Sequence, residues 1–387
     1  MNFTINRTAF INQLNNVLRA ISSKTTIPIL TGLKMVVDTD RIVLTGSNSD
    51  ITIESVIDAS DEDYGLTVKE AGAIVLPARF FSEIVKKLPD KQVTIEVTSV
   101  FQTDITSGTA KFQINGQDAS NFPHLPEIES DNTITLPTDV LKEVIRQTVI
   151  AVSKQESRPI LAGVHFTLKD GLLTAVATDS HRLAQRKVAL ENVDSSINFD
   201  IIIPGKSLDE LSGMMGDGIE DVKVQVSENQ VLFIFGNTHF YSRLLEGNYP
   251  ETSQLIPTTS DTTVEVEAGT FLSSIDRASL LSHESRNDVV KLTIQPANQR
   301  VKISSDSPDI GTVEEEVATT ALEGQDLDPV GLVLIILGAV KGVEGRLRDA
   351  PRHAGPGGPA LLGIDAEGQG LVPQGVLLGG QQQVGHK

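Results

Sequence analysis

Ala177-Thr178-Asp179-Ser180-His181-Arg182-Leu183, near the middle of the 387-residue chain, is one copy of a repeated corner. Pro159-Ile160-Leu161-Ala162-Gly163 begins 19 residues before Thr178 (178 − 159), and Pro28-Ile29-Leu30-Thr31-Gly32 begins 19 residues before Ser47 (47 − 28). Ser47 opens the echo Ser47-Asn48-Ser49-Asp50-Ile51, and a third echo is Ser305-Asp306-Ser307-Pro308-Asp309-Ile310. The copies stand 131 (178 − 47) and 127 (305 − 178) residues apart. This regular spacing predicts that similar domains follow one another along the chain.

The composition indicates a globular protein that uses no thiol chemistry. Apolar residues make up 39% of the chain and cysteine is absent, so there is no disulfide, no cysteine-ligated metal and no thiol nucleophile. The first residues lack an apolar signal core, and the longest apolar run, Val330–Val340, is shorter than the roughly 20 residues that span a bilayer. These features predict a cytoplasmic protein with no membrane association. The net charge of -19 argues against phosphate binding unless the charges are segregated by face.

The order of predicted elements repeats twice within each domain, as strand, helix and further strands. Apolar residues at helical spacing predict a helix over 8–22, and a second unit has a strand at 73–76 followed by a helix that begins at Pro77. Ile201–Lys206 repeats the pattern of Ile74–Arg79 at an offset of 127 (206 − 79). Polar, proline-containing linkers separate the rounds. We therefore predict a first domain at 1–125, a second at 130–250 and a partial third at 258–317.

The residues after about Ala318 do not continue this pattern. Gly, Pro and Gln crowd into 318–387, no aromatic residue occurs there, and no alternating strand pattern is visible. The sixth strand–helix–strands half is therefore missing, as if the last half-domain had been replaced. We interpret 318–387 as a foreign or out-of-frame tail that is poorly ordered. A natural low-complexity extension is the alternative.

Three neighbouring reactive residues, Asp179, Ser180 and His181, suggest a hydrolase, but the repeat argues against one. Neighbours on one strand or turn point in different directions, whereas a catalytic triad is assembled from distant segments. The other two copies carry Asp50 (181 − 131) and Pro308 (181 + 127) at the position of His181, so the corner needs no histidine there. We interpret the stretch as a turn or a pocket wall. A soluble hydrolase that uses these three residues is the alternative.

Other motifs of catalysis or metal binding are incomplete. Gly205-Lys206-Ser207 resembles the end of a phosphate-binding loop, but that loop needs a glycine where Asp200 stands. The seven histidines are scattered without metal-binding spacing. We therefore predict no metal, no cofactor and no catalytic residue.

Basic residues gather on the predicted helices, while acids cluster in turns and strands such as 58–63, 127–131 and 314–316. Ordinary solvated helices would give this pattern. A surface lined by helices that binds phosphates without contacting bases would also give this pattern, because salt screens the more distant negative charges over about 8–10 Å. The basic residues of the helices are Arg7, Arg19, Arg79, Lys86, Lys87, Lys142, Arg146, Lys206 and Arg277.

Five motifs together resemble one family, the bacterial DNA polymerase III beta subunits or beta sliding clamps. The motifs are Pro28–Gly32, Pro77–Phe81, Arg158–Gly163, Ala177–Leu183 and Asn248-Tyr249-Pro250, and the resemblance covers about 1–317. It implies an α+β DNA clamp fold of three repeated domains, with helices lining the inner face and sheets outside. It also implies a head-to-tail homodimer that closes into a ring around duplex DNA without reading its sequence. Such a ring tethers the replicative polymerase for processivity and is not an enzyme.

The resemblance further implies the partners and the site residues. The partners would be the DNA polymerase III catalytic subunit, the clamp loader and other proteins that dock a clamp-binding peptide. The DNA-facing residues would be Lys24, Arg79, Gln155 and Lys206. The partner-peptide groove would contain Leu161, Thr178, His181, Arg182, Leu183, Pro250 and Leu255. The dimer interface would contain Lys111, Phe112, Ile114, Leu280, Leu281, Glu314 and Glu315.

The tail departs from the family, whose last half-domain completes both the third domain and the groove. We therefore expect a chain that folds well through its second domain but dimerises and loads onto DNA poorly. A peptide-binding scaffold with no DNA role is a further alternative.

Overall fold

The computed structural model of the chain forms two compact units, Met1–Leu141 with Lys206–Leu244, and Lys142–Gly205 with Leu245–Lys387. The structure describes residues 1–99, 101–123, 128, 133–155, 157–180, 182–190, 193–194, 196–216, 218–253, 255, 262–282, 289–324, 327–333, 344–349, 361–367 and 374–379.

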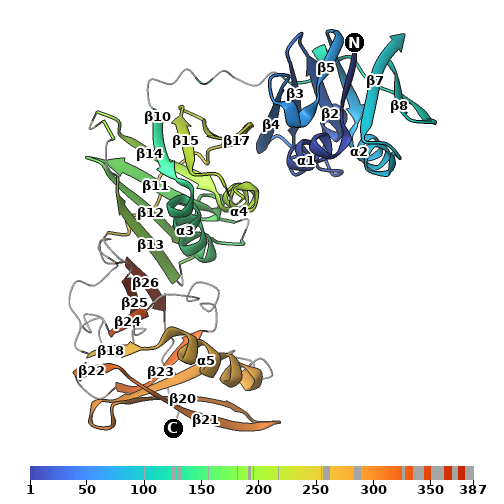
Figure 1. The fold of residues 1–387 in the computed structure, drawn as a ribbon. Coiled ribbons are helices and arrows are strands. Elements are labelled where there is room, and N and C mark those ends of the chain that lie inside the picture. The colour runs from blue at the N-terminus through green and yellow to red at the C-terminus, as the bar shows by residue number, and fades with distance from the viewer. Residues whose placement is uncertain are drawn as a thin grey trace. The chain divides into compact units, whose positions relative to one another are not determined.

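Two antiparallel sheets form the first unit (Figure 1). One has the strand order β5-β1-β7-β8-β9, made of Thr67–Glu70, Asn2–Asn6, Gln92–Ser99, Gln102–Ser107 and Ala110–Asn115. The other has the order β10-β15-β16-β17-β4-β3-β2-β6, made of Thr133–Pro137, Asp221–Val226, Gln230–Phe235, Thr238–Arg243, Ile51–Asp58, Arg41–Ser47, Gly32–Val37 and Gly72–Pro77. Because β17 pairs with β4, this sheet continues from one segment of the unit into the other.

Helices α1 (Arg7–Leu18) and α2 (Ala78–Lys87) supply much of the core of the first repeat. The side chain of Asn6 caps α1 by accepting hydrogen bonds from two backbone N–H groups. Phe10 lies edge-on to Phe3 and to Phe81, with ring centroids 6.3 and 6.2 Å apart, so the two helices share an aromatic core. The helix predicted over 8–22 ends earlier, at Leu18. The next backbone N–H groups bond carbonyls three residues back, which tightens the chain out of the α-helix.

Two further sheets form the second unit. The nine-stranded sheet has the order β14-β11-β12-β13-β26-β25-β24-β18-β22, made of Phe199–Pro204, Gly163–Lys169, Leu172–Thr178, Arg182–Ala189, Gln374–Gly379, Leu361–Glu367, Glu344–Asp349, Thr262–Val266 and Ala321–Gly324. The four-stranded sheet has the order β21-β20-β19-β23, made of Gly311–Ala318, Arg300–Ser307, Val289–Gln295 and Leu327–Val333. Helix α5 (Ala268–Ser282) buries Phe271, Ile275 and Ala278 in the same core as Val290 and Ile303.

Helices α3 (Thr138–Thr148) and α4 (Gly205–Met214) lie at two positions in the sequence where the chain passes from one unit to the other. Each follows a strand directly, as α1 and α2 do, so the strand–helix order predicted for each half-domain is confirmed for these four helices. The described helices include none that is both long and apolar enough to cross a membrane.

The glycine of the repeated Pro-Ile-Leu-x-Gly motif is required by a close approach of neighbouring strands. Short 3-10 helices at Pro28–Thr31 and Pro159–Ala162 precede Gly32 and Gly163. A Cβ at Gly32 would lie 2.4 Å from a Val75 side-chain carbon, and one at Gly163 would lie 2.5 Å from a carbon of Ile202. The two halves therefore repeat the same tight packing.

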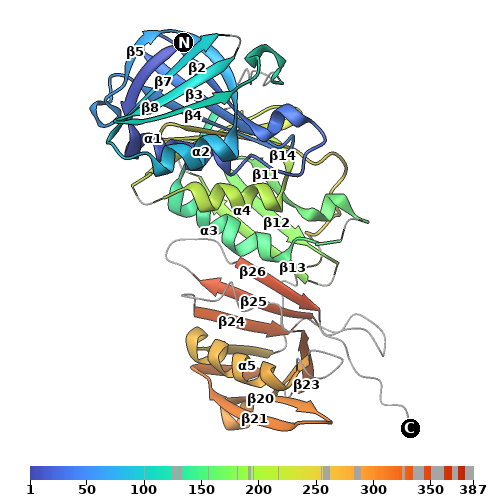
Figure 2. The same ribbon diagram turned by 90° about the vertical axis from the view of Figure 1, so that its right-hand side faces the viewer.

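The tail contains strands that the sequence did not predict. β22, β23, β24, β25 and β26 all begin after Ala318, and β26 pairs with β13. The sequence shows no alternating apolar pattern in these segments, and backbone hydrogen bonds along an open edge need none. Figure 2 shows β24, β25 and β26 as consecutive strands of one sheet. All regular elements among the described tail residues are strands, so no sixth helix occurs in them.

Candidate functional site

The second copy of the corner is held by its own hydrogen bonds. The Thr178 hydroxyl donates to the Arg182 carbonyl at 2.6 Å and accepts from the Ser180 N–H at 3.1 Å. Asp179 accepts from both the backbone N–H and the Nε of Arg182, each at 3.0 Å. Ser180 has a φ of 77°, a left-handed conformation that non-glycine residues adopt rarely. The polar groups of the stretch therefore shape a turn.

The first copy forms the same turn. The Ser47 hydroxyl donates to the Ile51 carbonyl at 3.2 Å and accepts from the Ser49 N–H at 3.4 Å. Ser49 has a φ of 80°. The same atoms at the same spacing thus make both corners, which confirms that the stretch is a repeated structural element.

The third echo was predicted to be another such corner, and this prediction is wrong. β20 continues through the echo, with Ser305 opposite Val313 and Ser307 opposite Gly311. The turn therefore falls two residues later than in the other copies. Gly311 has a φ of 141°, a conformation open to glycine, and so permits the ladder to extend this far.

The described residues of the second corner do not show the contacts that a serine hydrolase needs. A serine nucleophile requires a base within hydrogen-bond reach. The Ser180 hydroxyl instead accepts a hydrogen bond from the Arg158 guanidinium at 2.8 Å, and a guanidinium accepts no proton. The Asp179 carboxylate is held by Arg182. His181 lies outside the described residues.

Tyr249 joins the corner to the segment that follows β17. Its hydroxyl accepts a hydrogen bond from the Thr178 N–H at 3.0 Å, and its ring stacks on His165 with centroids 4.9 Å apart. The ring also packs against Val176 and Leu183. Burial raises the pKa of Tyr249 to about 12, so the phenol stays neutral near pH 7. Sequence reasoning used this tyrosine only as part of a motif, although it is one of three in the chain.

The residues predicted to form the partner-peptide groove differ in how far they are exposed. Leu161, Thr178 and Leu183 are buried, and Arg182 is half-buried. Pro250 and Leu255 are exposed. The Thr178–Leu183 corner is tied to the turn before Leu161 through the Arg158–Ser180 hydrogen bond.

One edge of this corner is covered by backbone from the tail. β26 pairs with β13, with Leu378 opposite Arg182 and Leu377 opposite Leu183. The strand that lies beside Arg182 therefore comes from a segment in which the sequence analysis predicted neither a helix nor a strand.

The four residues predicted to face DNA are all exposed. They are Lys24, Arg79, Gln155 and Lys206.

Several basic residues of the helices are paired with acids, which the sequence pattern did not reveal. Arg79 forms an exposed ion pair with Glu83 at 3.4 Å. Arg19 and Arg146 pair with Glu210 and Glu143. Within the described part of the chain, neither Lys24 nor Lys206 has an acidic partner. These two lysines are therefore the freest of the predicted phosphate contacts.

The predicted interface residues of the first repeat lie on an edge strand. Among the described strands β9 pairs with β8 alone, and Phe112 is 42% exposed on it. The Lys111 ammonium lies 2.8 Å from the Asp104 carboxylate, and Gln113 donates to the same carboxylate at 2.8 Å. These hydrogen bonds, with that of Lys111 the larger, lower the pKa of Asp104. Ile114 is half-buried.

The predicted interface residues of the third repeat also lie beside a sheet edge. In the part of the chain that the structure describes, β21 pairs with β20 alone. Leu280 on α5 is 69% exposed, whereas Leu281 is half-buried. Glu314 pairs with Lys302 at 2.9 Å. Glu315 accepts hydrogen bonds from Arg277, which lower its pKa, and from Ser274.

The repeated corners and helices define a three-repeat α+β protein of the DNA-clamp class. Models of the DNA polymerase III beta subunit match its N-terminal domain at residues 1–126, its central domain at 135–251 and its C-terminal domain at 253–330. The chain belongs to the DNA polymerase III beta subunit family.

Individual relatives are similar over most of the chain. The beta sliding clamp of Bacillus subtilis is 49% identical over 346 residues, which are 89% of this chain and 91% of that protein. The beta sliding clamp of Staphylococcus epidermidis is 48% identical over 328 residues, which are 84% of this chain and 86% of that protein. The solved DNA polymerase sliding clamp from Bacillus subtilis superposes with a TM-score of 0.91 at 45% identity, covering 99% of this chain and 100% of that one.

Proposed function

We propose that this protein is a DNA sliding clamp that closes with a second copy into a ring around duplex DNA and tethers a replicative DNA polymerase in the cytoplasm. One observation carries the proposal: the whole repeat architecture superposes on the Bacillus subtilis clamp at a TM-score of 0.91. In such a ring the chain makes and breaks no covalent bond. Its contribution is topological, because a closed ring leaves DNA only by opening or by sliding off an end.

The exposed cations of the helices suit DNA that must slide. Lysine and arginine attract phosphates whatever the base sequence, and such contacts re-form as the duplex moves. Lys24 and Lys206 would contribute most, since no described acid neutralises them. Arg79 can turn from Glu83 to a phosphate at little cost, because exposed ion pairs contribute only about 0–1 kcal/mol.

The open edges of β9 and β21 support closure of the ring between two copies. No described strand pairs with the outer side of either one, so a strand from another copy can pair there. β9 carries Lys111 and exposed Phe112, whereas β21 carries three consecutive glutamates, Glu314–Glu316. A head-to-tail contact would therefore join opposite charges across paired edges.

The second corner suits an apolar anchor of a partner peptide. Leu161 and Leu183 are buried, so an apolar anchor would contact the half-buried Tyr249 ring and the exposed Pro250, and Tyr249 can donate its hydroxyl proton to a peptide carbonyl. A solved sliding clamp from Bartonella birtlesii, 27% identical to this chain, is bound to griselimycin, which supports a ligand-binding surface on clamps.

Retention on circular DNA tests the proposal. The protein is loaded by a clamp loader onto nicked circular DNA, and the complex is passed through a sizing column in salt that removes simple ion pairing. We expect the protein to stay with the circle and to leave after a restriction enzyme makes the circle linear. Equal retention on linear and circular DNA, or none on either, would contradict the ring.

Substituting the free lysines separates phosphate contact from topology. A Lys24→Gln and Lys206→Gln variant should load less well and show a weaker salt dependence of DNA binding. A Lys69→Gln and Lys169→Gln variant, which removes two cations from strands outside the predicted DNA-facing set, is the charge-matched control. The proposed contacts fail if both variants lose DNA binding equally.

A further inference from the structure

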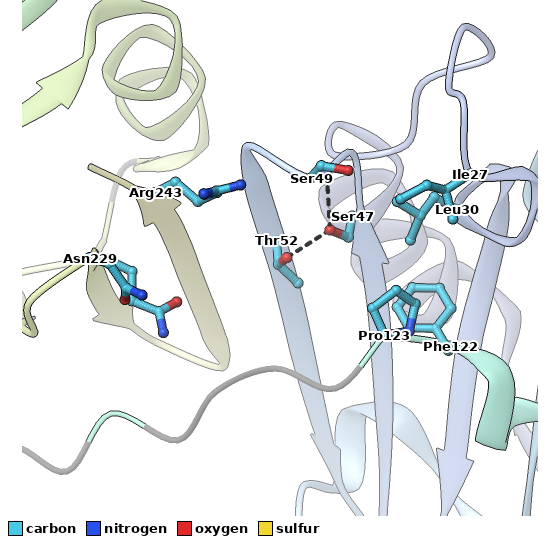
Figure 3. A pocket seen from close by; sticks show the side chains of 10 residues that line it. Ile27, Leu30, Ser47, Ser49, Thr52, Phe122, Pro123, Asn229 and Arg243 are labelled. Atoms are coloured by element: carbon cyan, nitrogen blue, oxygen red, sulfur yellow. Dashed lines mark hydrogen bonds between the residues drawn. The ribbon is translucent and has the colours of Figure 1, made fainter. Parts of the chain in front are cut away.

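The first unit contains a cavity of about 310 Å³ beside the first copy of the corner (Figure 3). One end of its lining is apolar, formed by Ile27, Leu30, Phe122 and Pro123. The other end is polar, formed by Asn229, Gln230 and Arg243. Ser47, Ser49 and Thr52 lie between the two ends.

Strand register places the polar lining on one face of the eight-stranded sheet. Gln230 lies opposite Arg243, Tyr241 lies opposite Thr52, and Thr52 lies opposite Ser47. Residues directly opposite each other point to the same face, and so do residues two apart on one strand, such as Tyr241 and Arg243. The cavity therefore runs across β16, β17, β4 and β3.

Gln230 lines the polar end of the cavity. The residue is only 8% exposed, and within the described residues its carboxamide makes no hydrogen bond. Because Gln230 lines the cavity, a bound molecule can supply the missing partner.

Arg243 provides a free positive charge at the same end. The residue is exposed, and no acid among the described residues pairs with its guanidinium. Figure 3 shows its side chain extending from β17 toward the corner. The Thr52 hydroxyl donates to the Ser47 hydroxyl at 2.8 Å, and the Ser47 hydroxyl donates to the Ile51 carbonyl. The Thr52 and Ser47 hydroxyls in the middle of the cavity thus make hydrogen bonds within the chain, and the polar groups open to a ligand lie at the Arg243 end.

We propose that this cavity binds the C-terminal residues of an extended peptide. The terminal carboxylate accepts hydrogen bonds from Arg243 and from the amide NH₂ of Gln230, and an aliphatic or aromatic side chain packs against the exposed Ile27 and Pro123. β17 and β3 lie two strand spacings apart, about 10 Å, which an extended peptide covers in about three residues. The apolar residue therefore stands about two positions before the carboxyl end.

The repeat explains why a hollow forms at this place. Leu30, Ser47 and Thr52 stand 131 residues before Leu161, Thr178 and Leu183. Phe122 and Pro123 stand 127 residues before Tyr249 and Pro250. The same fold element thus builds a surface at both corners, and the free arginine and glutamine give the first one its preference for an acid. Binding there does not depend on the ring proposed above.

Binding of a synthetic tripeptide to the full-length protein tests the inference. The probe is acetyl-Phe-Ala-Ala with a free carboxylate, compared with the same peptide as a C-terminal amide, and affinity is measured by titration calorimetry or ligand-observed NMR. We expect the acid to bind at least tenfold more tightly than the amide, since charge-assisted hydrogen bonds are about twice as strong as neutral ones. Arg243→Gln should remove this difference.

Two variants make the result specific. Arg41→Gln removes the same charge from the other end of β3, where Arg41 pairs with Asp38, and should leave binding unchanged. Gln230→Glu places a second carboxylate beside that of the peptide and should make the amide the better ligand. The inference is overturned by no binding at millimolar peptide, by equal binding of acid and amide, or by acid binding that survives Arg243→Gln. That last result would place the peptide elsewhere on the protein.

Discussion

Replacing Gly163 by alanine should loosen the packing beside the second corner. A Cβ there would lie 2.5 Å from a carbon of Ile202, 2.8 Å from a carbon of Leu245 and 3.0 Å from the carbonyl oxygen of Ile203. Two of these neighbours are side chains on different segments, and the third is backbone of the paired strand β14, so no single rotamer change relieves all three. Overpacking of this kind costs about 1–3 kcal/mol. At 1.4 kcal/mol per factor of ten, the opening equilibrium should rise by roughly fivefold to 150-fold.

Hydrogen–deuterium exchange measures this effect locally. A chain of several domains does not unfold in one transition, so the rates are read from peptides that span β11 and β14. Gly216→Ala is the control, because nothing lies within 4 Å of a Cβ at that position and its φ is not in the left-handed region. That variant should be neutral or slightly stabilising, since alanine restricts the unfolded chain. Similar exchange in the two variants would refute the account of the repeated glycine.

Three further outcomes are expected. Sedimentation at micromolar concentration should show a dimer that partly dissociates, because the described tail adds strands but no helix to the third repeat; a dimer that stays fully associated would contradict this. Tyr249→Phe should lower stability by about 1–3 kcal/mol, because the Thr178 N–H loses its acceptor, and unchanged exchange at Thr178 would count against that bond. The pKa of Asp104 is lowered, mainly by its hydrogen bond with Lys111. The folding stability that this carboxylate contributes is therefore present above its ordinary pKa of 3.8 and is lost as the pH falls below that value. Lys111→Met should therefore reduce the acid sensitivity of β9 exchange, and an unaltered pH profile would argue against the pair.

The sequence predicted the fold where a motif specifies its own hydrogen bonds. A hydroxyl, a left-handed residue and a carbonyl four positions on are enough to build the corner, and both Ser47 and Thr178 supply the hydroxyl. The third echo has Ser305 in the same place, yet its turn is shifted because Gly311 accepts a conformation that extends the ladder. A single glycine downstream therefore outweighed the local motif. The tail strands were missed for a different reason, since their pairing uses backbone groups that composition does not report.

The candidate site was predictable in part. The exposure of Lys24 and Lys206 follows from a helix or loop position, but the neutralisation of Arg19 by Glu210 joins residues 191 positions apart and requires the fold. Tyr249 shows the same limit. Its motif was visible, whereas its hydroxyl contact with Thr178 spans 71 positions.

The two corners show how a repeat can duplicate a fold while its chemistry diverges. At equivalent places the first corner carries Thr52 and the second carries Leu183, so the second offers more apolar surface. The polar end of the first cavity comes from the following repeat, through Gln230 and Arg243. Beside the second corner the following segment is the tail, which does not continue the repeat, and its strand β26 meets β13 with Leu377 and Leu378. We therefore expect selection for an acid at the first corner, whereas the second corner holds a ligand through apolar contact and the Tyr249 hydroxyl.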